Sequence, residues 1–209
     1  MSESLRVAPV GTDAARYAVE HWHYSGSLPV PPHVKFGVWE HDKFIGVVIY
    51  SRGTAPHIGD PFGLTQEQVC ELTRVALNAH DAPVSQIVAE TLRQLKQRAP
   101  GLRLVVSFAD PAEGHHGGIY QAGNWIYNGD TAPTPMYVDK AGRRWHSRQV
   151  NATGYKTQFG VKRKVPKTGD MTKIMTPGKH RYLMPLDKPM RRKIERMRKT
   201  PPTKAENEA

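Results

Sequence analysis

The sequence predicts a mixed α/β (α+β) fold in which helices flank one central sheet and a basic extension follows. Three observations lead to this prediction. Short apolar runs typical of strands alternate with amphipathic helical patterns before residue 131. The apolar run at 102–109 is typical of a buried strand, and Asp110-Pro111 ends it because proline has no N–H to donate. From about residue 131 the composition becomes strongly basic.

The elements before the apolar run are predicted from local patterns of apolar, turn-forming and capping residues. They are a helix at 13–22, an antiparallel hairpin of 35–40 and 43–50, an irregular loop at 52–66, a strand at 69–77 and a helix at 83–98. The last helix is the clearest, because its apolar residues share one face. We expect Thr12 or Asp13 to cap the first helix and Asp81 to cap the second.

The rest of the chain contains shorter predicted elements. After the apolar strand these are a short helix at 116–122, a last strand at 124–127 and a short basic helix at 190–199. The polar, proline-containing tail from residue 201 is expected to be disordered. The predicted organisation is a domain over 1–165, whose basic part begins near 131, followed by a basic extension over 166–209.

Composition narrows the class of protein. Lys and Arg number 30 against 19 Asp and Glu, which gives a net charge of +11 and favours a polyanionic partner, nucleic acid first. A basic protein without a nucleic-acid role is the alternative. A single cysteine, Cys70, excludes an intrachain disulfide and a multi-cysteine zinc site. No apolar run reaches the ~18 residues of a membrane span, and no signal-peptide core is visible, so we expect a cytoplasmic protein.

The end of the strand at 102–109 is the first place to expect chemistry. Ser107 and Asp110 lie there, followed by a glycine-broken loop with His115 and His116. In open α/β sheets, ligands bind at the carboxyl ends of strands. Asp110 also has a purely structural interpretation, because Asp before Pro commonly forms a turn.

Four motifs resemble those of a known family. They are His23-Tyr-Ser-Gly, Glu71-Leu-Thr-Arg74, Ser107-Phe-Ala-Asp110 and Gly118-Ile-Tyr120-Gln-Ala-Gly-Asn-Trp125. In this order, and followed by a basic segment, they are similar to the Mom family of phage DNA-modification proteins. The element order over 13–128 looks like the GNAT acyltransferase fold. Tyr120-Gln-Ala-Gly-Asn-Trp resembles that superfamily's Tyr-x-x-x-Gly-Phe ending, from which Asn124 and Trp125 differ.

The resemblance implies an enzyme that uses a small-molecule donor to convert adenine in double-stranded DNA to its N6-carbamoylmethyl (acetamido) form. This modification shields phage DNA from restriction nucleases, which places a phage-encoded enzyme in the host cytoplasm. Adenine N6 is a poor nucleophile, so the reaction needs proton removal, an activated donor and a base taken out of the duplex. The expected catalytic residues are Asp110, Tyr120, His23 and Tyr24.

Each candidate residue has an expected role, and several also have a purely structural interpretation. Asp110 is expected to accept the N6 proton, Tyr120 to act as a general acid, and His23 to move a proton at a pKa near neutrality. Tyr120 could equally be a buried structural tyrosine. The expected cofactor-binding residues are Arg74, Ser85 and Ser107. For Arg74 the alternative is an ion pair with Glu71, and for Ser85 a first-turn hydrogen bond.

The donor is where the sequence departs from the GNAT superfamily. Its members carry a Gly-rich loop whose backbone N–H groups hold the pyrophosphate of CoA. The equivalent stretch here is Asn78-Ala-His-Asp-Ala-Pro83, which has no glycine, a negative Asp81, and no N–H at Pro83. Acetyl-CoA is therefore a candidate expected to bind weakly, with a Kd of about 10⁻⁴ M or above, unless the donor is another molecule.

A metal site is also open at this stage. Two histidines with Asp110 or Glu71 would suit a 2-His-1-carboxylate iron site. The candidate ligands are His21, His23, His115 and His116. Ten histidines along the chain make accidental pairs common. Cys70, inside a predicted strand, is expected to pack as a small hydrophobe.

The basic segment interleaves cations with aromatic residues. Lys and Arg would supply phosphate contacts, and an aromatic ring could stack on an unstacked base. The expected DNA-binding residues are Arg143, Arg144, Trp145, Arg148, Lys156, Lys162, Arg163 and Lys164. A solvated basic face without DNA contacts is the alternative. Two other functions remain open: a GNAT-like acyltransferase for proteins or small molecules, and a basic DNA-binding protein without catalysis.

Overall fold

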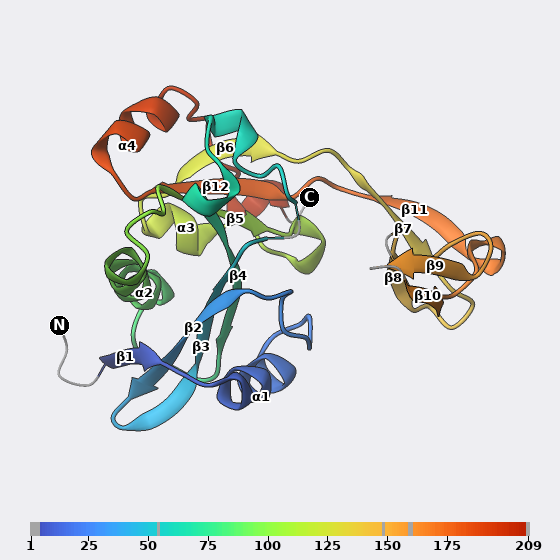
Figure 1. The fold of residues 1–209 in the computed structure, drawn as a ribbon, viewed down its shortest axis with the longest axis horizontal. Coiled ribbons are helices and arrows are strands. Elements are labelled where there is room, and N and C mark those ends of the chain that lie inside the picture. The colour runs from blue at the N-terminus through green and yellow to red at the C-terminus, as the bar shows by residue number, and fades with distance from the viewer. Residues whose placement is uncertain (1–4, 54, 148, 159–160, 208–209) are drawn as a thin grey trace.

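The computed structural model describes residues 5–53, 55–147, 149–158 and 161–207. Its core is a seven-stranded sheet in the order β1-β2-β3-β4-β5-β12-β6 (Figure 1). The strands are β1 (Leu5–Pro9), β2 (His33–Glu40), β3 (Lys43–Ser51), β4 (Val69–Leu77), β5 (Leu104–Ala109), β12 (His180–Pro185) and β6 (Ile126–Asp130). Neighbouring strands are antiparallel, except that β4 and β5 are parallel. The predicted mixed fold is confirmed.

Helices cover both faces of this sheet. α2 (Val84–Arg98) packs on one face together with α3 (Gly118–Ala122). α1 (Thr12–Trp22) and α4 (Lys188–Glu195) cover the other face at its two ends. The continuous apolar runs of β3 and β5 serve both layers, because successive residues of a strand point to opposite faces of the sheet.

The apolar stripe predicted for the helix at 83–98 is the centre of the larger core cluster. Ile87 and Leu95 of α2 are fully buried, against Phe36, Tyr50 and Val105 of the sheet. Truncation of such a leucine to alanine typically costs about 2–5 kcal/mol. Cys70 is buried in the same cluster, as expected of a small hydrophobe.

The predicted helix caps were wrong. α1 begins after Gly11 and α2 after Pro83, and neither has a side-chain cap. The Thr12 hydroxyl accepts a hydrogen bond from Lys35 Nζ at 2.9 Å. Asp81 does not accept a hydrogen bond as a cap would; instead its backbone N–H donates to the Glu40 carboxylate at 2.8 Å. Thr12 and Asp81, expected as caps, are therefore engaged by distant parts of the chain.

β6 is not the last strand, and the segment after 165 is not merely an extension. β12 lies between β5 and β6, so the C-terminal part supplies a central strand of the main sheet. Asp187 then caps α4 at the Met190 N–H and pairs with Arg103 before β5, at 2.7 and 2.8 Å. Part of the tail expected to be disordered is a short helix, α5 (Lys204–Asn207).

Between β6 and β12 the chain builds a small basic lobe, residues 134–176, set apart from the main body (Figure 1). It contains a three-stranded sheet and a hairpin: β11 (Thr172–Thr176), β7 (Thr134–Val138) and β8 (Arg144–His146), with β9 (Tyr155–Gln158) and β10 (Val161–Lys164). At its base, Thr131 and Lys179 exchange two hydrogen bonds of 2.9 Å. Asp130 accepts there from His180 Nδ1 at 2.6 Å.

The described helices include none with both the length and the apolar character needed to cross a bilayer.

Candidate active site

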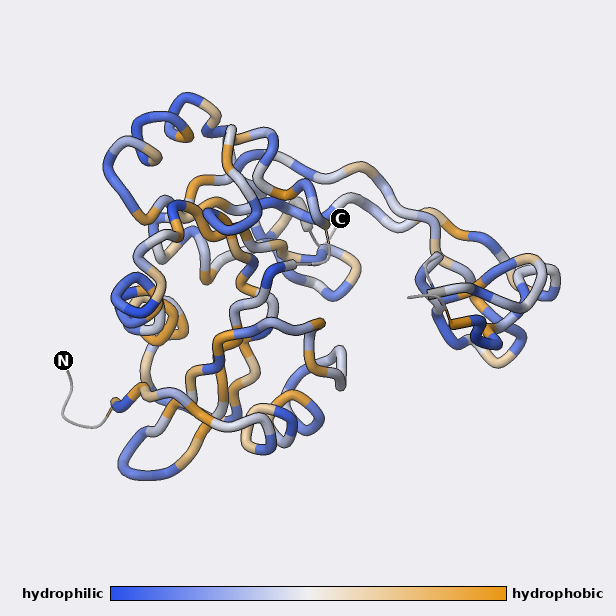
Figure 2. The backbone as a smooth tube through the Cα atoms, viewed as in Figure 1, coloured by the Kyte–Doolittle hydropathy of each residue, from blue (hydrophilic) through white to orange (hydrophobic). Residues whose placement is uncertain are grey.

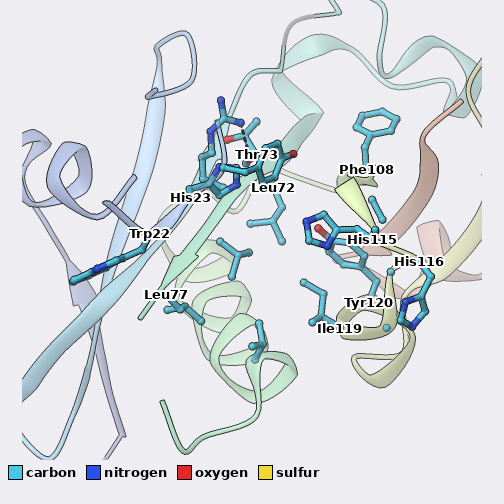
Figure 3. Close-up of a pocket in the computed structure, with 18 of the residues that line it drawn as sticks. Trp22, His23, Leu72, Thr73, Leu77, Phe108, His115, His116, Ile119 and Tyr120 are labelled. Atoms are coloured by element: carbon cyan, nitrogen blue, oxygen red, sulfur yellow. Dashed lines mark hydrogen bonds between the residues drawn. The ribbon is translucent and has the colours of Figure 1, made fainter. Parts of the chain in front are cut away.

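A cavity of about 600 Å³ opens where β4 and β5 separate (Figure 3). The two strands pair only along Val69–Leu72 and Leu104–Ser107, although β4 continues to Leu77. Beyond that point the walls come from β4, from the end of β5, from the loop after α1 and from the loop before α3. The polar lining residues are His23, Tyr24, Thr73, Arg74, His80, His115, His116 and Tyr120. A cavity therefore lies at the strand end where the sequence predicts the site.

Tyr120 lies at the floor of this cavity, 8% exposed. Its hydroxyl is 2.8 Å from Ser107 Oγ, which is itself 2.9 Å from the Leu72 carbonyl oxygen. A serine hydroxyl has one proton and a carbonyl can only accept, so both bonds form when Ser107 donates to Leu72 and Tyr120 donates to Ser107. Burial raises the pKa of Tyr120 to about 12. Tyr120 is therefore a protonated hydrogen-bond donor at neutral pH.

His23 faces the cavity from the end of α1. Its Nδ1 accepts a hydrogen bond from the Ser25 N–H at 3.1 Å, so the neutral ring carries its proton on Nε2. Burial, together with the positive charge of Arg74 and the nearby His115, lowers the pKa of His23 to about 4. The expectation of a pKa near neutrality was wrong, because the ring is partly buried beside a cation.

This shift predicts a pH-dependent stability. The pKa of His23 falls from 6.5 unfolded to about 4 folded, so the unfolded chain binds the proton more readily. The contribution of His23 to the free energy of unfolding is complete above pH 6.5 and is lost as the pH falls towards 4. We expect the loss of unfolding free energy between pH 7.5 and pH 5 to be smaller in His23→Gln. Urea unfolding at both pH values measures it, with the exposed His21→Gln as control; equal losses in the two variants would contradict the assignment.

Arg74 forms the upper wall of the cavity. Its guanidinium donates to the carbonyl oxygens of Ser27 and Thr73, at 3.1 and 2.7 Å, which holds the loop after α1 against β4. Burial lowers the pKa of Arg74, and the nearby Tyr24 and Glu71 oppose that shift. Of the described residues that line the cavity, Arg74 is the one Arg or Lys, and none is Asp or Glu. The lining therefore favours a neutral or anionic ligand.

Tyr24 lies at the mouth, 60% exposed, and stacks on the His23 ring at 4.4 Å between centroids. His115 approaches it from the opposite wall at 5.8 Å. Figure 3 shows His115 and Tyr120 on one side of the cavity and His23 with Thr73 on the other. An exposed aromatic face is thus available at the entrance.

Asp110 lies just behind this mouth, at the end of β5. Its Oδ1 accepts from the Ala112 N–H at 3.1 Å, the turn role that Asp-Pro suggested. Its Oδ2 pairs with Lys179 Nζ at 2.7 Å. Lys179 is a residue that sequence reasoning missed, since nothing local connects it with a position 69 residues earlier. Asp110 does not line the cavity, but its charge acts on Tyr24, which does.

The two remaining candidates for cofactor binding, Ser107 and Ser85, do not line the cavity. Ser107 is fully buried beneath Tyr120 and does not line the cavity. Ser85 lies in the first turn of α2, whereas its neighbour Val84 is the one that lines the wall. Gly117 adopts φ +86° before α3, where a Cβ would overlap the Tyr182 ring, so glycine is needed for the loop to seat His116 against the cavity.

The candidate metal ligands are not brought together. Within the described residues, no three His, Cys, Asp or Glu side chains are grouped as a metal ion would need. His21 does not line the cavity and donates from Nδ1 to the Tyr17 carbonyl at 2.8 Å. His23, His115 and His116 do line the cavity, but Asp110 is engaged by Lys179.

The turn between β4 and α2 does not fit a diphosphate. Its Asp81 and Ala82 N–H groups donate to the two carboxylate oxygens of Glu40, at 2.8 and 2.7 Å. Glu40 lies at the end of β2, and its contact with this turn was not predicted from the sequence. The residues present thus do not match the pyrophosphate position that the fold implies for CoA.

The predicted DNA-binding residues that the structure describes all lie in the basic lobe; Arg148 falls outside the described residues. Most of these cations are exposed: Arg143, Arg144, Lys162, Arg163 and Lys164. Trp145 is half-buried, its Nε1 donates to Asp139, and Arg143 lies over its ring at 5.1 Å. Lys156 donates to the Ser147 carbonyl at 3.2 Å.

Comparison with known proteins agrees with this architecture. The Mom protein family matches residues 4–203. The chain belongs to the Mom protein family. It is similar to the methylcarbamoylase Mom of Escherichia phage Mu, with 26% identity over 198 residues that cover 92% of this chain and 80% of that protein.

A solved structure with a similar fold is spermidine N-acetyltransferase from Vibrio cholerae. Its TM-score is 0.50 at 8% identity, and the match covers 91% of this chain and 99% of that chain. At this identity the likeness concerns the fold alone. The GNAT-like fold expected from the element order is confirmed.

Proposed function

We propose that this Mom family protein is a DNA-modifying transferase that attaches a carbamoylmethyl group to N6 of adenine. The observation that carries the proposal is the family match over residues 4–203, together with the named activity of the phage Mu relative. The geometry supports it in two places: the cavity at the β4–β5 split and the basic lobe beside the main body.

The cavity, together with the Asp110 carboxylate behind its mouth, supplies groups suited to an amine acting as nucleophile. N6 forms a bond to the methylene carbon of the donor, and the donor's leaving group departs with the bonding electrons. The N6 proton becomes strongly acidic once that bond forms, so a carboxylate suffices to accept it. We assign this step to Asp110, which Lys179 releases by moving its half-exposed side chain.

Tyr120, Arg74 and His23 act on the donor. The Tyr120 O–H turns from Ser107 into the cavity and donates to the leaving group, while Ser107 keeps its bond to Leu72. Arg74 attracts an anionic portion of the donor, and the His23 Nε2–H donates to a donor oxygen. Each group is available at neutral pH in the protonation state that its role requires.

Tyr24 and the lobe act on DNA. A base taken out of the duplex stacks on an aromatic face with a gain of about 1–3 kcal/mol, and Tyr24 offers such a face at the cavity mouth. The lobe carries ten Lys and Arg against two Asp over 134–176, and hydrophilic stretches alternate with hydrophobic ones along its backbone (Figure 2). Most of the net charge of +11 is therefore concentrated there.

Salt dependence tests the lobe. Replacing Arg143, Arg144 and Arg148 by Gln should lower the slope of log K against log salt by about 0.9 for each phosphate that the variant no longer binds. Fluorescence anisotropy with a labelled duplex at several salt concentrations measures the slope. The matched control removes the same charge from α4 and its C-cap through Lys188→Gln, Arg192→Gln and Arg196→Gln. Equal slopes for the lobe variant and the wild type would remove these arginines from the interface.

Restriction protection tests the function itself. Plasmid DNA from cells that express the chain should resist nucleases whose recognition sites contain adenine, and DNA from cells with Tyr120→Phe should be cut. Nucleases with sites of only G and C serve as control. Complete cutting of adenine-containing sites, with the wild-type protein folded and abundant, would contradict the proposal.

A further inference from the structure

The turn before α2 contains a carboxylate where an anion would otherwise bind. Glu40 is 5% exposed, although it lies at the end of a hairpin strand. Its Oε2 accepts from the Asp81 N–H at 2.8 Å and its Oε1 from the Ala82 N–H at 2.7 Å. One carboxylate thus accepts the hydrogen bonds of two adjacent backbone N–H groups.

Backbone donors at this place would ordinarily attract phosphate. They precede a 15-residue helix, and the N-terminal end of a helix carries partial positive charge that binds anions. Elsewhere in the turn, the Asn78 N–H donates to the Ile45 carbonyl at 2.8 Å, and Pro83 has no N–H. Glu40 therefore holds two backbone donors of this turn, and neither the Asn78 N–H nor Pro83 offers another.

The charge at the turn is also unfavourable to phosphate. Burial acts to raise the pKa of Glu40, but the bonds from Asp81 and Ala82 and the nearby His80 and His41 outweigh it, so the pKa lies below its ordinary value. The Asp81 carboxylate adds a second negative group, 3.8 Å from His41 Nε2. A diphosphate placed here would meet two carboxylates at close range, which repel it.

This turn forms one wall of the candidate active site. Leu77, His80 and Val84, on both sides of Asp81 and Ala82, line the cavity. Arg74 stands further along the same wall, on β4.

We propose that Glu40 selects the donor by occupying the diphosphate position before α2, so that the donor is a small molecule without a diphosphate, held by a single anionic or polar group at Arg74. This rests on the proposed function, because it names the donor class for the same cavity. CoA thioesters and nucleotide-activated donors are excluded at this position. Glu40 is thus a specificity-determining residue that does not take part in the chemistry.

Direct binding tests the proposal. Isothermal titration of the wild-type protein with inorganic pyrophosphate or desulfo-CoA should give a Kd of about 10⁻⁴ M or weaker. Glu40→Ala should bind pyrophosphate about tenfold more tightly or better, since it frees two N–H groups and removes a close like charge. Glu20→Ala, which removes an exposed carboxylate from α1, should behave as wild type.

Amide signals of the wild-type protein provide a measurement that needs no variant. The Asp81 and Ala82 N–H resonances should not shift with millimolar pyrophosphate, because Glu40 already holds both protons. Micromolar binding with shifts at these two amides would overturn the proposal, as would a folded Glu40→Ala without gain. If Glu40→Ala does not fold, the wild-type amides decide alone. No DNA is present in these experiments, so their outcome is independent of the modification assay.

Discussion

Asp110→Asn is expected to lower adenine modification by about 10²-fold or more, the scale of general-base catalysis. Asparagine keeps the size of the side chain and an oxygen for the Ala112 N–H, so the turn after β5 should fold as before. What it loses is the ability to take up a proton. Quantification of modified nucleoside in DNA, normalised to soluble protein, measures the effect.

Lys179 decides between two explanations of that loss. If Asp110 accepts the proton, Lys179→Met leaves the carboxylate free and modification at saturating DNA stays within a few-fold of wild type. If Asp110 serves only to hold Lys179 at the base of the lobe, Lys179→Met removes the same 2.7 Å ion pair and loses as much activity as Asp110→Asn. Equal losses in both variants would therefore contradict the base assignment.

Tyr120→Phe is expected to cost about 10²-fold in modification, the lower end for a positioned general acid. Folding should suffer by only about 1 kcal/mol, because Ser107 retains its bond to the Leu72 carbonyl when the phenol is removed. Thermal melting and the nucleoside assay, measured on the same preparation, separate the two effects.

Tyr50→Phe is the matched control for this change. Tyr50 is also a buried tyrosine of the main core, and its hydroxyl is hydrogen-bonded to the Thr91 hydroxyl at 2.7 Å. Neither residue lines the cavity. The Tyr50→Phe variant should lose a similar amount of stability and keep its activity. Equal activity of Tyr120→Phe and Tyr50→Phe would reduce Tyr120 to a structural residue.

Much of the main sheet could be predicted because its signals are local. The hairpin at 35–50, the strand at 69–77 and the amphipathic stripe at 83–98 each show their periodicity within a short window, and β2, β3, β4 and α2 follow them closely. β12 could not be found in this way. Its apolar residues Tyr182 and Leu183 face opposite, equally buried sides in a short segment between basic stretches, so no alternation marks it.

The residues of the candidate site could be predicted from the sequence, but their hydrogen-bond and ion-pair partners could not. Motif positions pointed to His23, Arg74 and Tyr120, and the structure brings all three to one cavity. The partners that set their chemistry are long-range: Asp110 meets Lys179 across the base of the lobe, and Glu40 meets a turn some forty residues away. The sequence alone could not show that His23 is shielded enough to stay neutral.

The most direct test is mass analysis of nucleosides from the DNA of cells that express the chain. The account predicts a new deoxyadenosine derivative whose added mass is that of one carbamoylmethyl group, and whose fragmentation places the group on the base. Its amount should fall by about 10²-fold or more with Asp110→Asn and by about 10²-fold with Tyr120→Phe. Only unmodified deoxyadenosine in the DNA of cells that contain folded wild-type protein, or an acyl group on protein in its place, would contradict it.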